Sequence, residues 1–367
     1  FVNRADGVFN VMDYGATGNG TTDDTAAIAS AHTALPANGG TIYFPAGTYQ
    51  VSSLTFTKPT HLLGAGVTAS TIRATNATSN VIILDGADML VEHLFFDKTV
   101  TRTAGAYVQL TTNGNRSTLC NFRMTAAFVG VRISAGATVR VQNGSIRDGA
   151  TGAGSGGILV DAGNDTYIDN ITMDAAVGSQ PSFGINVTAT GALNITNCDI
   201  VHHTDDLLIN PSSGTLAAIY VLNSYFDTAV RGITISPSGA ASVVRCRFVG
   251  CWASSHTDRG VLIDGTGTTG VIQHIEFIGL HAISNTGVGT GDGVLLTGTT
   301  LDGVSFIGGL FAANVGSGIS IAASVSEFQI IGVRSGAING LAGNVYGIFL
   351  AGSNTAYRII GCDLNGN

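Results

Sequence analysis

The chain has 367 residues and a formal net charge of −8, and only 11% of its residues are charged. The negative net charge provides no basic surface for nucleic acid or anionic lipid. No apolar run is long enough to cross a bilayer. Residues 1–20 lack a signal-peptide pattern. The 51 glycines, 6 prolines and 44% hydrophobic residues favour many short strands joined by tight turns.

One helix is predicted near the N-terminus, in the segment TTDDTAAIASAHTAL at residues 21–35. Asp23 or Asp24 would cap this helix and give it an acidic first turn. Apolar residues recur at helical spacing at Ala27, Ile28, Ala31 and Leu35. A stack of strands exposes its core and unpaired edges at an open end, so we expect the helix to cover the first coil. Residues 1–50 are therefore predicted to be a capping segment.

The rest of the chain is a repeat. In each repeat a small or polar residue is followed by a short segment in which apolar residues alternate with others. The small or polar residue recurs at Gly130, Gly157, Gly184, Asp206, Gly232, Gly260, Gly293, Gly318 and Gly347, at intervals of 22 to 33 residues, and we call these positions the glycine column. Each repeat holds at least two short strands, which is typical of a solenoid coil. The sequence predicts an all-β, right-handed, single-stranded parallel β-helix that forms one continuous domain over residues 51–367.

A second column keeps step with the glycine column. It contains Asn121, Asn143, Asn170, Asn197 and Asn223, and we place Arg245, His274, Gly303, Gly332 and Gly361 at the corresponding positions of later coils. Asparagine at one position of stacked coils predicts a ladder of side-chain amides, each hydrogen-bonded to the next.

Charged residues concentrate in the turn between the asparagine and glycine columns. Successive coils supply Arg147 and Asp148; Asp174; His202, His203, Asp205 and Asp206; Asp227 and Arg231; and then Trp252, His256, Asp258 and Arg259. Asp174 and Asp227 each follow a column asparagine by four residues, so stacked coils would hold them in line about 9–10 Å apart. Two carboxyl groups roughly 6.5–9.5 Å apart suit an inverting glycosidase.

The turn therefore predicts four catalytic candidates, Asp174, Asp205, Asp206 and Asp227. Six residues are predicted to bind the substrate: His202, His203, Arg231, Trp252, Asp258 and Arg259. Arg231 would hold an anionic sugar and Trp252 would stack on a sugar ring. The alternatives are that the aspartates only cap a turn, that Trp252 fills a coil corner, or that a histidine or Arg231 is the base of a lyase.

No cofactor or metal site is predicted. Calcium could bind Asp205, Asp206 and Asp227 through oxygen ligands, but their spacing does not match a calcium-binding loop. The five cysteines have no paired CxxC spacing, so neither a disulfide framework nor a zinc site is indicated, and they are expected to be buried apolar side chains.

The segments FNVMDYGATGNGTTDDTAAIASA and GGTIYFPAGTYQV, within residues 8–51, resemble the opening of the pectate-lyase-like β-helix superfamily. That superfamily includes bacteriophage tailspike depolymerases, polygalacturonases, exo-glucanases and alginate epimerases, so the resemblance implies a protein that binds or cleaves polysaccharide. Polygalacturonases carry one aspartate on a coil and a pair of aspartates on the next coil. Asp205 and Asp206 resemble the pair, and Asp174 resembles the single aspartate. However, Arg231-Gly232 stands where those enzymes have His-Gly, and no Arg-Ile-Lys triplet follows.

This departure favours a phage tailspike-type protein that binds and degrades a bacterial surface glycan, as a glycoside hydrolase rather than a lyase. Such a protein would be extracellular or part of a virion. We expect a homotrimer, because the last coil has no capping helix and the mean hydropathy is +0.33. A virion or a further C-terminal domain is another expected partner. The alternatives are a non-catalytic tail-fibre or adhesin shaft that binds glycan, and a secreted polygalacturonase-like enzyme.

Overall fold

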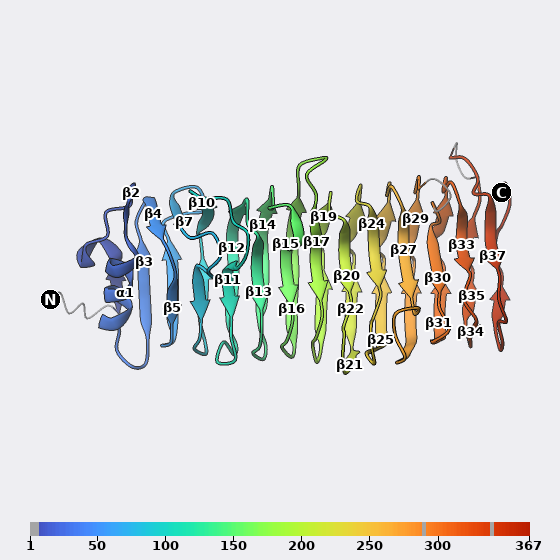
Figure 1. Cartoon of the computed structure of the whole chain (residues 1–367), viewed down its shortest axis with the longest axis horizontal. Helices are drawn as coiled ribbons and strands as arrows, with labels where there is room; N and C mark the ends of the chain where they lie inside the picture. The colour runs from blue at the N-terminus through green and yellow to red at the C-terminus, as the bar shows by residue number, and fades with distance from the viewer. Residues whose placement is uncertain (1–6, 288–290, 338–340) are drawn as a thin grey trace. The chain divides into compact units, whose positions relative to one another are not determined.

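The computed structural model describes residues 7–287, 291–337 and 341–367. Within these residues the protein is an all-β parallel solenoid with one α-helix, which confirms the fold predicted from the repeat (Figure 1). The chain divides into two compact units, residues 1–182 and 183–367, and each is described by itself. The proposed boundary at residue 50 stays a prediction.

The first unit begins with a short 3-10 helix, η1 (Val11–Tyr14), and the helix α1 (Thr25–Ala34), which are followed by parallel strands. Its strands are β1 (Val8–Asn10), β2 (Asn19–Asp23), β3 (Gly40–Phe44), β4 (Gly47–Val51), β5 (Leu54–Phe56), β6 (Thr60–Gly64), β7 (Ser70–Ala74), β8 (Ile82–Leu84), β9 (Leu90–Glu92), β10 (Phe95–Lys98), β11 (Ala106–Leu110), β12 (Thr118–Thr125), β13 (Val129–Ile133), β14 (Arg140–Arg147), β15 (Gly152–Val160) and β16 (Thr166–Asp174).

The helix α1 lies where the sequence predicts it and buries Ile28 and Ala31, and its His32 ring lies 5.1 Å from the ring of Phe56 in β5. Asp24 occupies the N-cap position, but its carboxylate does not bond the helix. It accepts instead from the backbone N–H of Thr17 at 2.7 Å. The first turn of α1 carries no acidic residue, so that expectation was wrong. No helix in the described part of the chain is long and apolar enough to span a membrane.

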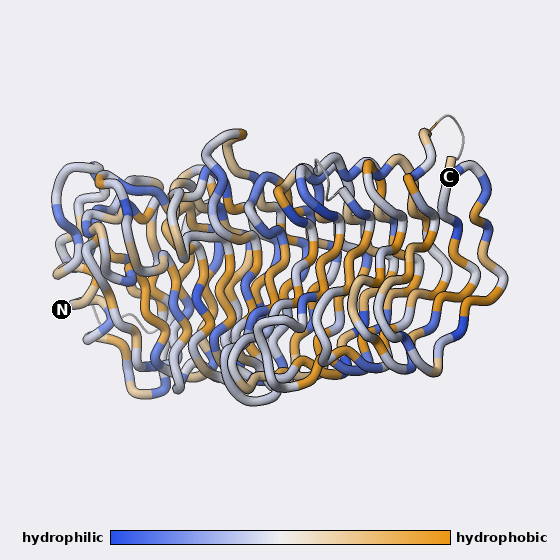
Figure 2. Tube along the Cα trace, turned by 45° about the vertical axis from the view of Figure 1, so that its right-hand side comes forward, coloured by the Kyte–Doolittle hydropathy of each residue, from blue (hydrophilic) through white to orange (hydrophobic). Residues whose placement is uncertain are grey.

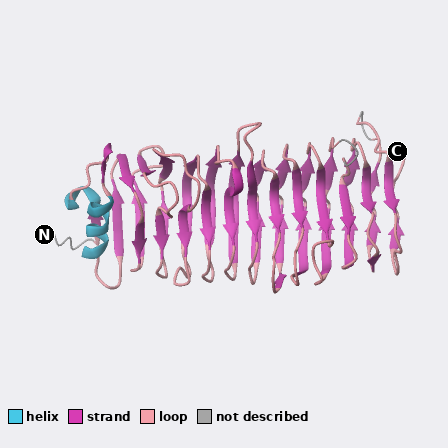
Figure 3. Ribbon diagram, in the orientation of Figure 1, coloured by secondary structure: helices cyan, strands magenta, loops and turns pink. Residues whose placement is uncertain are grey.

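The second unit consists of strands and turns, as the magenta arrows of Figure 3 show. Its strands are β17 (Pro181–Val187), which begins at the boundary, β18 (Leu193–Thr196), β19 (Asp199–Val201), β20 (Asp205–Ile209), β21 (Thr215–Ala217), β22 (Ile219–Leu222), β23 (Tyr225–Asp227), β24 (Arg231–Ile235), β25 (Ser242–Val249), β26 (Trp252–Ser254), β27 (Arg259–Asp264), β28 (Ile272–Ile278), β29 (His281–Ile283), β30 (Val294–Thr297), β31 (Leu301–Ile307), β32 (Leu310–Ala312), β33 (Ser317–Ile321), β34 (Val325–Ser326), β35 (Gln329–Ile331), β36 (Arg334–Ser335), β37 (Tyr346–Leu350) and β38 (Arg358–Ile360).

Apolar side chains fill the interior of each coil, and orange apolar stretches alternate with blue polar ones along the chain in Figure 2. In the second unit the rings of Phe248, Phe277 and Phe306 stack from coil to coil, with centroids 4.5 and 5.1 Å apart. All five cysteines are free, as expected, and all except Cys362 are buried.

The glycine column is present, and its positions lie opposite one another in the paired strands of each unit. In the second unit, Asp205 pairs with Arg231 and Arg231 pairs with Arg259, so the next residues, Asp206, Gly232 and Gly260, follow in register. A Cβ atom on Gly232 would lie 2.6 Å from the carbonyl oxygen of Gly260. The position therefore leaves little room for a side chain, and Asp206 carries one there.

The asparagine column has a conformational cause. Asn121, Asn143 and Asn170 in the first unit, and Asn197 and Asn223 in the second, have φ between 48° and 54°. Asparagine tolerates this left-handed conformation, which bends the chain between strands. Asn170 also donates to Asn143 at 2.9 Å, so a ladder contact accompanies the bend.

The continuation of this column was wrong at three positions. Strand register places Gly250 opposite Asn223, followed by Gly279 and Gly308, whose φ values are 63° to 65°. Arg245, His274 and Gly303 share register with one another in an earlier bend. Any position of a regular repeat recurs at nearly the same interval, so spacing alone could not separate the two bends.

Candidate functional site

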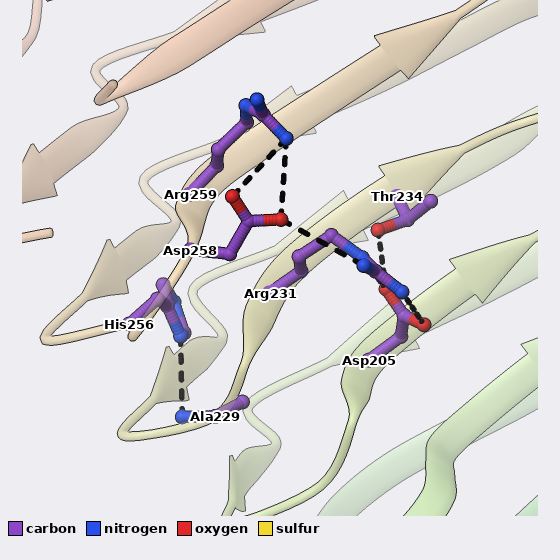
Figure 4. A network of polar contacts seen from close by, with 7 residues as sticks. All are labelled: Asp205, Ala229, Arg231, Thr234, His256, Asp258 and Arg259. Atoms are coloured by element: carbon purple, nitrogen blue, oxygen red, sulfur yellow. Dashed lines mark hydrogen bonds and ion pairs between the residues drawn. The ribbon is translucent and has the colours of Figure 1, made fainter. Parts of the chain in front are cut away.

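The charged turn of the second unit begins three neighbouring strands. Asp205 begins β20, Arg231 begins β24 and Arg259 begins β27, and the strand register places the three residues in line (Figure 4). Residues that start parallel strands in register lie one coil apart, about 4.8 Å. The turn therefore gathers charges from coils that are more than twenty residues apart in sequence.

Asp205 and Arg231 form a two-point ion pair. Both oxygens of Asp205 accept from Arg231, at 2.6 Å from Nε and 2.8 Å from Nη2, and the hydroxyl of Thr234 donates to the same carboxylate at 2.5 Å. The hydrogen bonds to Asp205 raise the pKa of the Arg231 guanidinium. These contacts favour the cationic form of Arg231, which suits binding of an anion.

Asp258 continues this network with two arginine contacts. It lies 3.7 Å from Nη1 of Arg231 and 3.1 Å from Nη1 of Arg259. Negative and positive groups thus alternate along the turn, and the side chains of Arg231 and Asp258 remain 27% and 20% exposed. A ligand at this surface would meet both arginines and the Asp258 carboxylate.

Asp206 is fully buried at its position in the glycine column. One carboxyl oxygen lies 3.2 Å from Nδ1 of His203, and the other has no hydrogen-bond partner among the described residues. Burial raises the pKa of Asp206 well above its usual range, and the negative charges of Asp205, Asp227 and Asp199 add to this effect. Burial thus favours the protonated form of Asp206, and the side chain lies too deep to touch a substrate directly.

Asp227 is the carboxylate beside Asp206 that reaches the surface. It ends β23 and is half-buried, and its Oδ1 is enclosed without a hydrogen-bond partner among the described residues. Asp174 ends β16 in the first unit. Its predicted alignment with Asp227 therefore stays a prediction.

His202 and His203 differ in position although they are adjacent. His203 is 3% exposed and bonds Asp206, whereas His202 is half-buried with φ at 64° in a bend. His203 can therefore position Asp206, and His202 is the histidine of this pair with access to solvent.

His256 lies in the charged turn as the sequence predicts, but it belongs to a buried ladder. Its Nδ1 accepts from the backbone N–H of Ala229 at 3.2 Å. Asn285 accepts from the N–H of His256 in the same way, and Asn314 accepts from the N–H of Asn285. Burial lowers the pKa of His256 to about 3, so the neutral imidazole replaces asparagine as the acceptor. The recurrence of asparagine at 285 and 314, 29 residues apart, was the signal in the sequence.

Trp252 lies in a row of aromatic rings rather than alone. Strand register places it between Tyr225 and His281, and the ring centroids lie 6.3 and 5.2 Å from its own. Tyr225 is 55% exposed and Trp252 is half-buried, so the row faces solvent and Trp252 does not plug a corner. Rings in this arrangement provide a flat surface for stacking. Tyr225 and His281 were not predicted as members of this row, although they occupy the same position of the repeat as Trp252.

No group of three or more histidine, cysteine or acidic residues in the described part of the chain could hold a metal ion.

Over residues 8–251 the sequence matches the family described as rhamnogalacturonase A/epimerase, pectate lyase-like, and the chain belongs to this family. A segment is 45% identical over 74 residues to mannuronan C5-epimerase AlgE2 of Azotobacter vinelandii, which is 18% of this chain and 7% of that protein. A longer segment is 33% identical over 118 residues to AlgE4 of the same organism, 29% of this chain and 20% of that protein. The chain thus matches only a small part of these relatives.

Two solved structures show the same fold. The A-module of Azotobacter vinelandii mannuronan C-5 epimerase AlgE4 has a TM-score of 0.69 at 20% identity, covering 94% of this chain and 98% of that chain. The Dettilon tailspike protein has a TM-score of 0.60 at 11% identity, covering 96% of this chain and 68% of that chain. At these identities the likeness establishes the fold alone.

Proposed function

We propose that the charged turn of the second unit binds and cleaves an acidic polysaccharide, as a glycoside hydrolase. The observation that carries this proposal is Asp206. A regular coil needs glycine at its position, yet the chain buries a carboxyl group there beside Asp227. Environments that keep one carboxyl protonated next to a second one are typical of acid–base catalysis.

In this proposal the groups have separate roles. Asp227 contacts the glycosidic linkage. Asp206 and His203 position Asp227 and hold a proton near it. Arg231, fixed by Asp205, binds a sugar carboxylate, with Arg259 and Asp258 beside it, and His202 contributes a further polar contact. The row of Tyr225, Trp252 and His281 supports the glycan. Asp174 remains the candidate for the second carboxylate.

The comparisons support the substrate class through the names of the relatives. The curated relatives include mannuronan C5-epimerases and alginate lyase 7, and the structural relatives include an exopolygalacturonase from Thermotoga maritima and the tailspike. We propose the phage tailspike type, extracellular or on a virion, for this chain, and the secreted polygalacturonase-like enzyme is the alternative.

Incubation of the protein with a panel of bacterial capsular polysaccharides, alginate and polygalacturonate tests the reaction. We expect new reducing ends on at least one acidic polysaccharide, without the ultraviolet absorbance of an unsaturated uronate. New reducing ends together with the ultraviolet absorbance of an unsaturated uronate would show that the protein is a lyase and not a hydrolase. No change in any polysaccharide of the panel would contradict cleavage.

A non-catalytic glycan-binding shaft is the second candidate, and one observation favours it. Both oxygens of Asp205 are committed to Arg231, and Asp206 is closed to solvent, so two of the four proposed catalytic residues are held by the protein itself. Retardation of the protein in a gel that contains an acidic polysaccharide, without new reducing ends, would support this candidate.

We also propose a homotrimer with parallel long axes, and a virion or a further domain as a partner. Several large apolar side chains of the last described strands are exposed, including Tyr346, Phe349 and Ile360. Exposed apolar surface of this kind favours association. Light scattering is expected to give a mass three times the 37.3 kDa of the chain, and a monomer mass at micromolar concentration would contradict the trimer.

A further inference from the structure

The helix α1 is held against strand β5 by two polar residues outside the charged turn, which we call the latch. The latch consists of His32 in the last turn of α1 and Lys58 in the segment between β5 and β6. Of its ten residues, α1 buries only Ile28 and Ala31. Because so little apolar surface holds the helix, the contacts of the latch contribute much of what keeps α1 in place.

The imidazole of His32 accepts two backbone hydrogen bonds in the latch. Its Nε2 lies 3.3 Å from the amide nitrogen of Thr57 and 3.5 Å from that of Lys58, and both N–H groups donate to it. An imidazole nitrogen that accepts a hydrogen bond carries no proton, so these contacts require the neutral ring. Protonation of Nε2 would point a third N–H group at the two donors and break both hydrogen bonds.

The ammonium group of Lys58 binds the C-terminal end of α1. It donates to the carbonyl oxygens of His32 at 3.3 Å, Thr33 at 2.9 Å and Leu35 at 2.6 Å, which are groups that a helix leaves unsatisfied at its end. The same positive charge disfavours a second one on the His32 ring. Burial and the charge of Lys58 accordingly lower the pKa of His32 from its ordinary value of 6.5.

The described elements that pack on α1 contribute few further titratable groups. α1 itself has none besides His32, β5 has none, and η1 carries Asp13 and Tyr14. Asp24 lies at the opposite end of the helix. Lys58 is therefore the charge that governs the protonation of His32.

The strand that α1 packs on is the edge of a sheet. β5 is the terminal strand of its sheet, and in the described part of the chain it pairs with β8 alone. The ring of His32 lies edge-on to Phe56 of this strand, with ring centroids 5.1 Å apart. An unpaired strand edge presents backbone groups that another chain can bind, so a helix that covers such an edge controls access to it.

We infer that the latch responds to acid: when His32 takes up a proton, α1 detaches and leaves the free edge of β5 uncovered, while the strands stay paired. The direction follows from linkage, because a group whose pKa is lower in the closed form than in the open form is protonated first in the open form. The contribution of the latch is therefore complete above about pH 6.5 and is lost as the pH falls below it. This inference goes beyond the proposed function and does not depend on cleavage of a glycan.

Hydrogen exchange of the full chain tests the inference, with the amides of α1 as the readout and the rates corrected for the direct effect of pH on exchange. The amides of β28, in the second unit, serve as the internal reference. Between pH 8 and pH 5 we expect the protection of α1 to fall about three- to tenfold relative to that of β28. Each unit by which the pKa of His32 is lower in the closed form changes the opening equilibrium by at most about tenfold.

His32→Gln removes the titration but keeps an acceptor, because the amide oxygen of glutamine extends about as far as Nε2 of histidine. Protection of α1 in this variant should be close to that of the parent at pH 8 and should not fall at pH 5. His274→Gln, the same change at an exposed position of the second unit, is the matched control and should show the fall of the parent. Lys58→Met should lower the protection of α1 already at pH 8, because the carbonyl oxygens at the helix end lose their donor.

Three outcomes of these experiments would overturn the inference: equal protection of α1 at pH 8 and pH 5, a fall that β28 shares in full, or the same fall in His32→Gln. A fall shared by β28 would show that the whole chain unfolds in acid. Titration of His32 by nuclear magnetic resonance in the parent protein is a second test that needs no variant. A pKa at or above 6.5 in the folded protein would contradict the latch.

Discussion

Asp227→Asn is expected to lower turnover of a cleaved polysaccharide by roughly two to four orders of magnitude, because the amide can neither donate nor accept the catalytic proton. The side chain keeps its size and lies at a half-buried strand end. Binding of the glycan and the melting temperature should therefore change little. The measurement is the rate of reducing-end formation at saturating substrate, together with affinity in a polysaccharide gel.

Two further substitutions separate the roles within the charged turn. Asp206→Asn should lower turnover less than Asp227→Asn, because Asp206 is fully buried and does not touch the substrate. Asp205→Asn removes the carboxylate that fixes Arg231, so it should raise the KM for an acidic substrate more than it lowers kcat. Full activity in all three variants would place the catalytic site elsewhere.

Asp264→Asn provides the matched control for these activity measurements. Asp264 lies in the same unit, and its carboxylate accepts from the backbone N–H of Thr266 at 2.9 Å, which an asparagine can also do. Its replacement should leave kcat, KM and stability near those of the parent. A loss as large as that of Asp227→Asn would indicate a general effect of charge on the assay.

The architecture could be predicted because each coil repeats the same residue types at the same positions. Glycine recurs wherever a side chain would collide with the next coil, as at Gly232 and Gly260, and asparagine recurs where the backbone bends with positive φ, as at Asn143 and Asn223. These requirements are local, so the sequence displays them directly. Register between coils is less local, and for that reason Arg245 and His274 were assigned to the wrong bend.

The candidate site was only partly predictable. Clustering of charge identified Asp205, Asp206 and Arg231, but the depth of each side chain depends on how the turn packs. Nothing in the adjacent pair of aspartates distinguishes Asp205, which bonds Arg231, from Asp206, which is enclosed. The structural role of His256 was missed because a lone histidine gives no sign that it replaces asparagine in a ladder.

His256→Ala is expected to destabilise the protein by about 2–5 kcal/mol, since it leaves the N–H of Ala229 buried without an acceptor and opens a cavity. His256→Asn should recover much of this loss, because asparagine is the acceptor at Asn285 and Asn314 in the same ladder. Thermal unfolding at pH 7 measures both variants. His274→Asn, at an exposed position, is the control for loss of a histidine.

The difference in stability between the parent and His256→Asn should also depend on pH, and the direction of this dependence follows from the pKa of His256. The folded protein holds this pKa at about 3, whereas the ordinary pKa of histidine is 6.5. As the pH falls below 6.5 the unfolded chain takes up the proton first, so the contribution of His256 to stability is complete above pH 6.5 and is lost progressively toward pH 3. Asp206 titrates in the opposite direction but is present in both proteins, so it cancels from the comparison. His256→Asn should therefore be less stable than the parent at pH 7, and the difference should shrink or reverse by pH 4. A difference in melting temperature that is the same at both pH values would show that His256 is not held neutral in the folded protein.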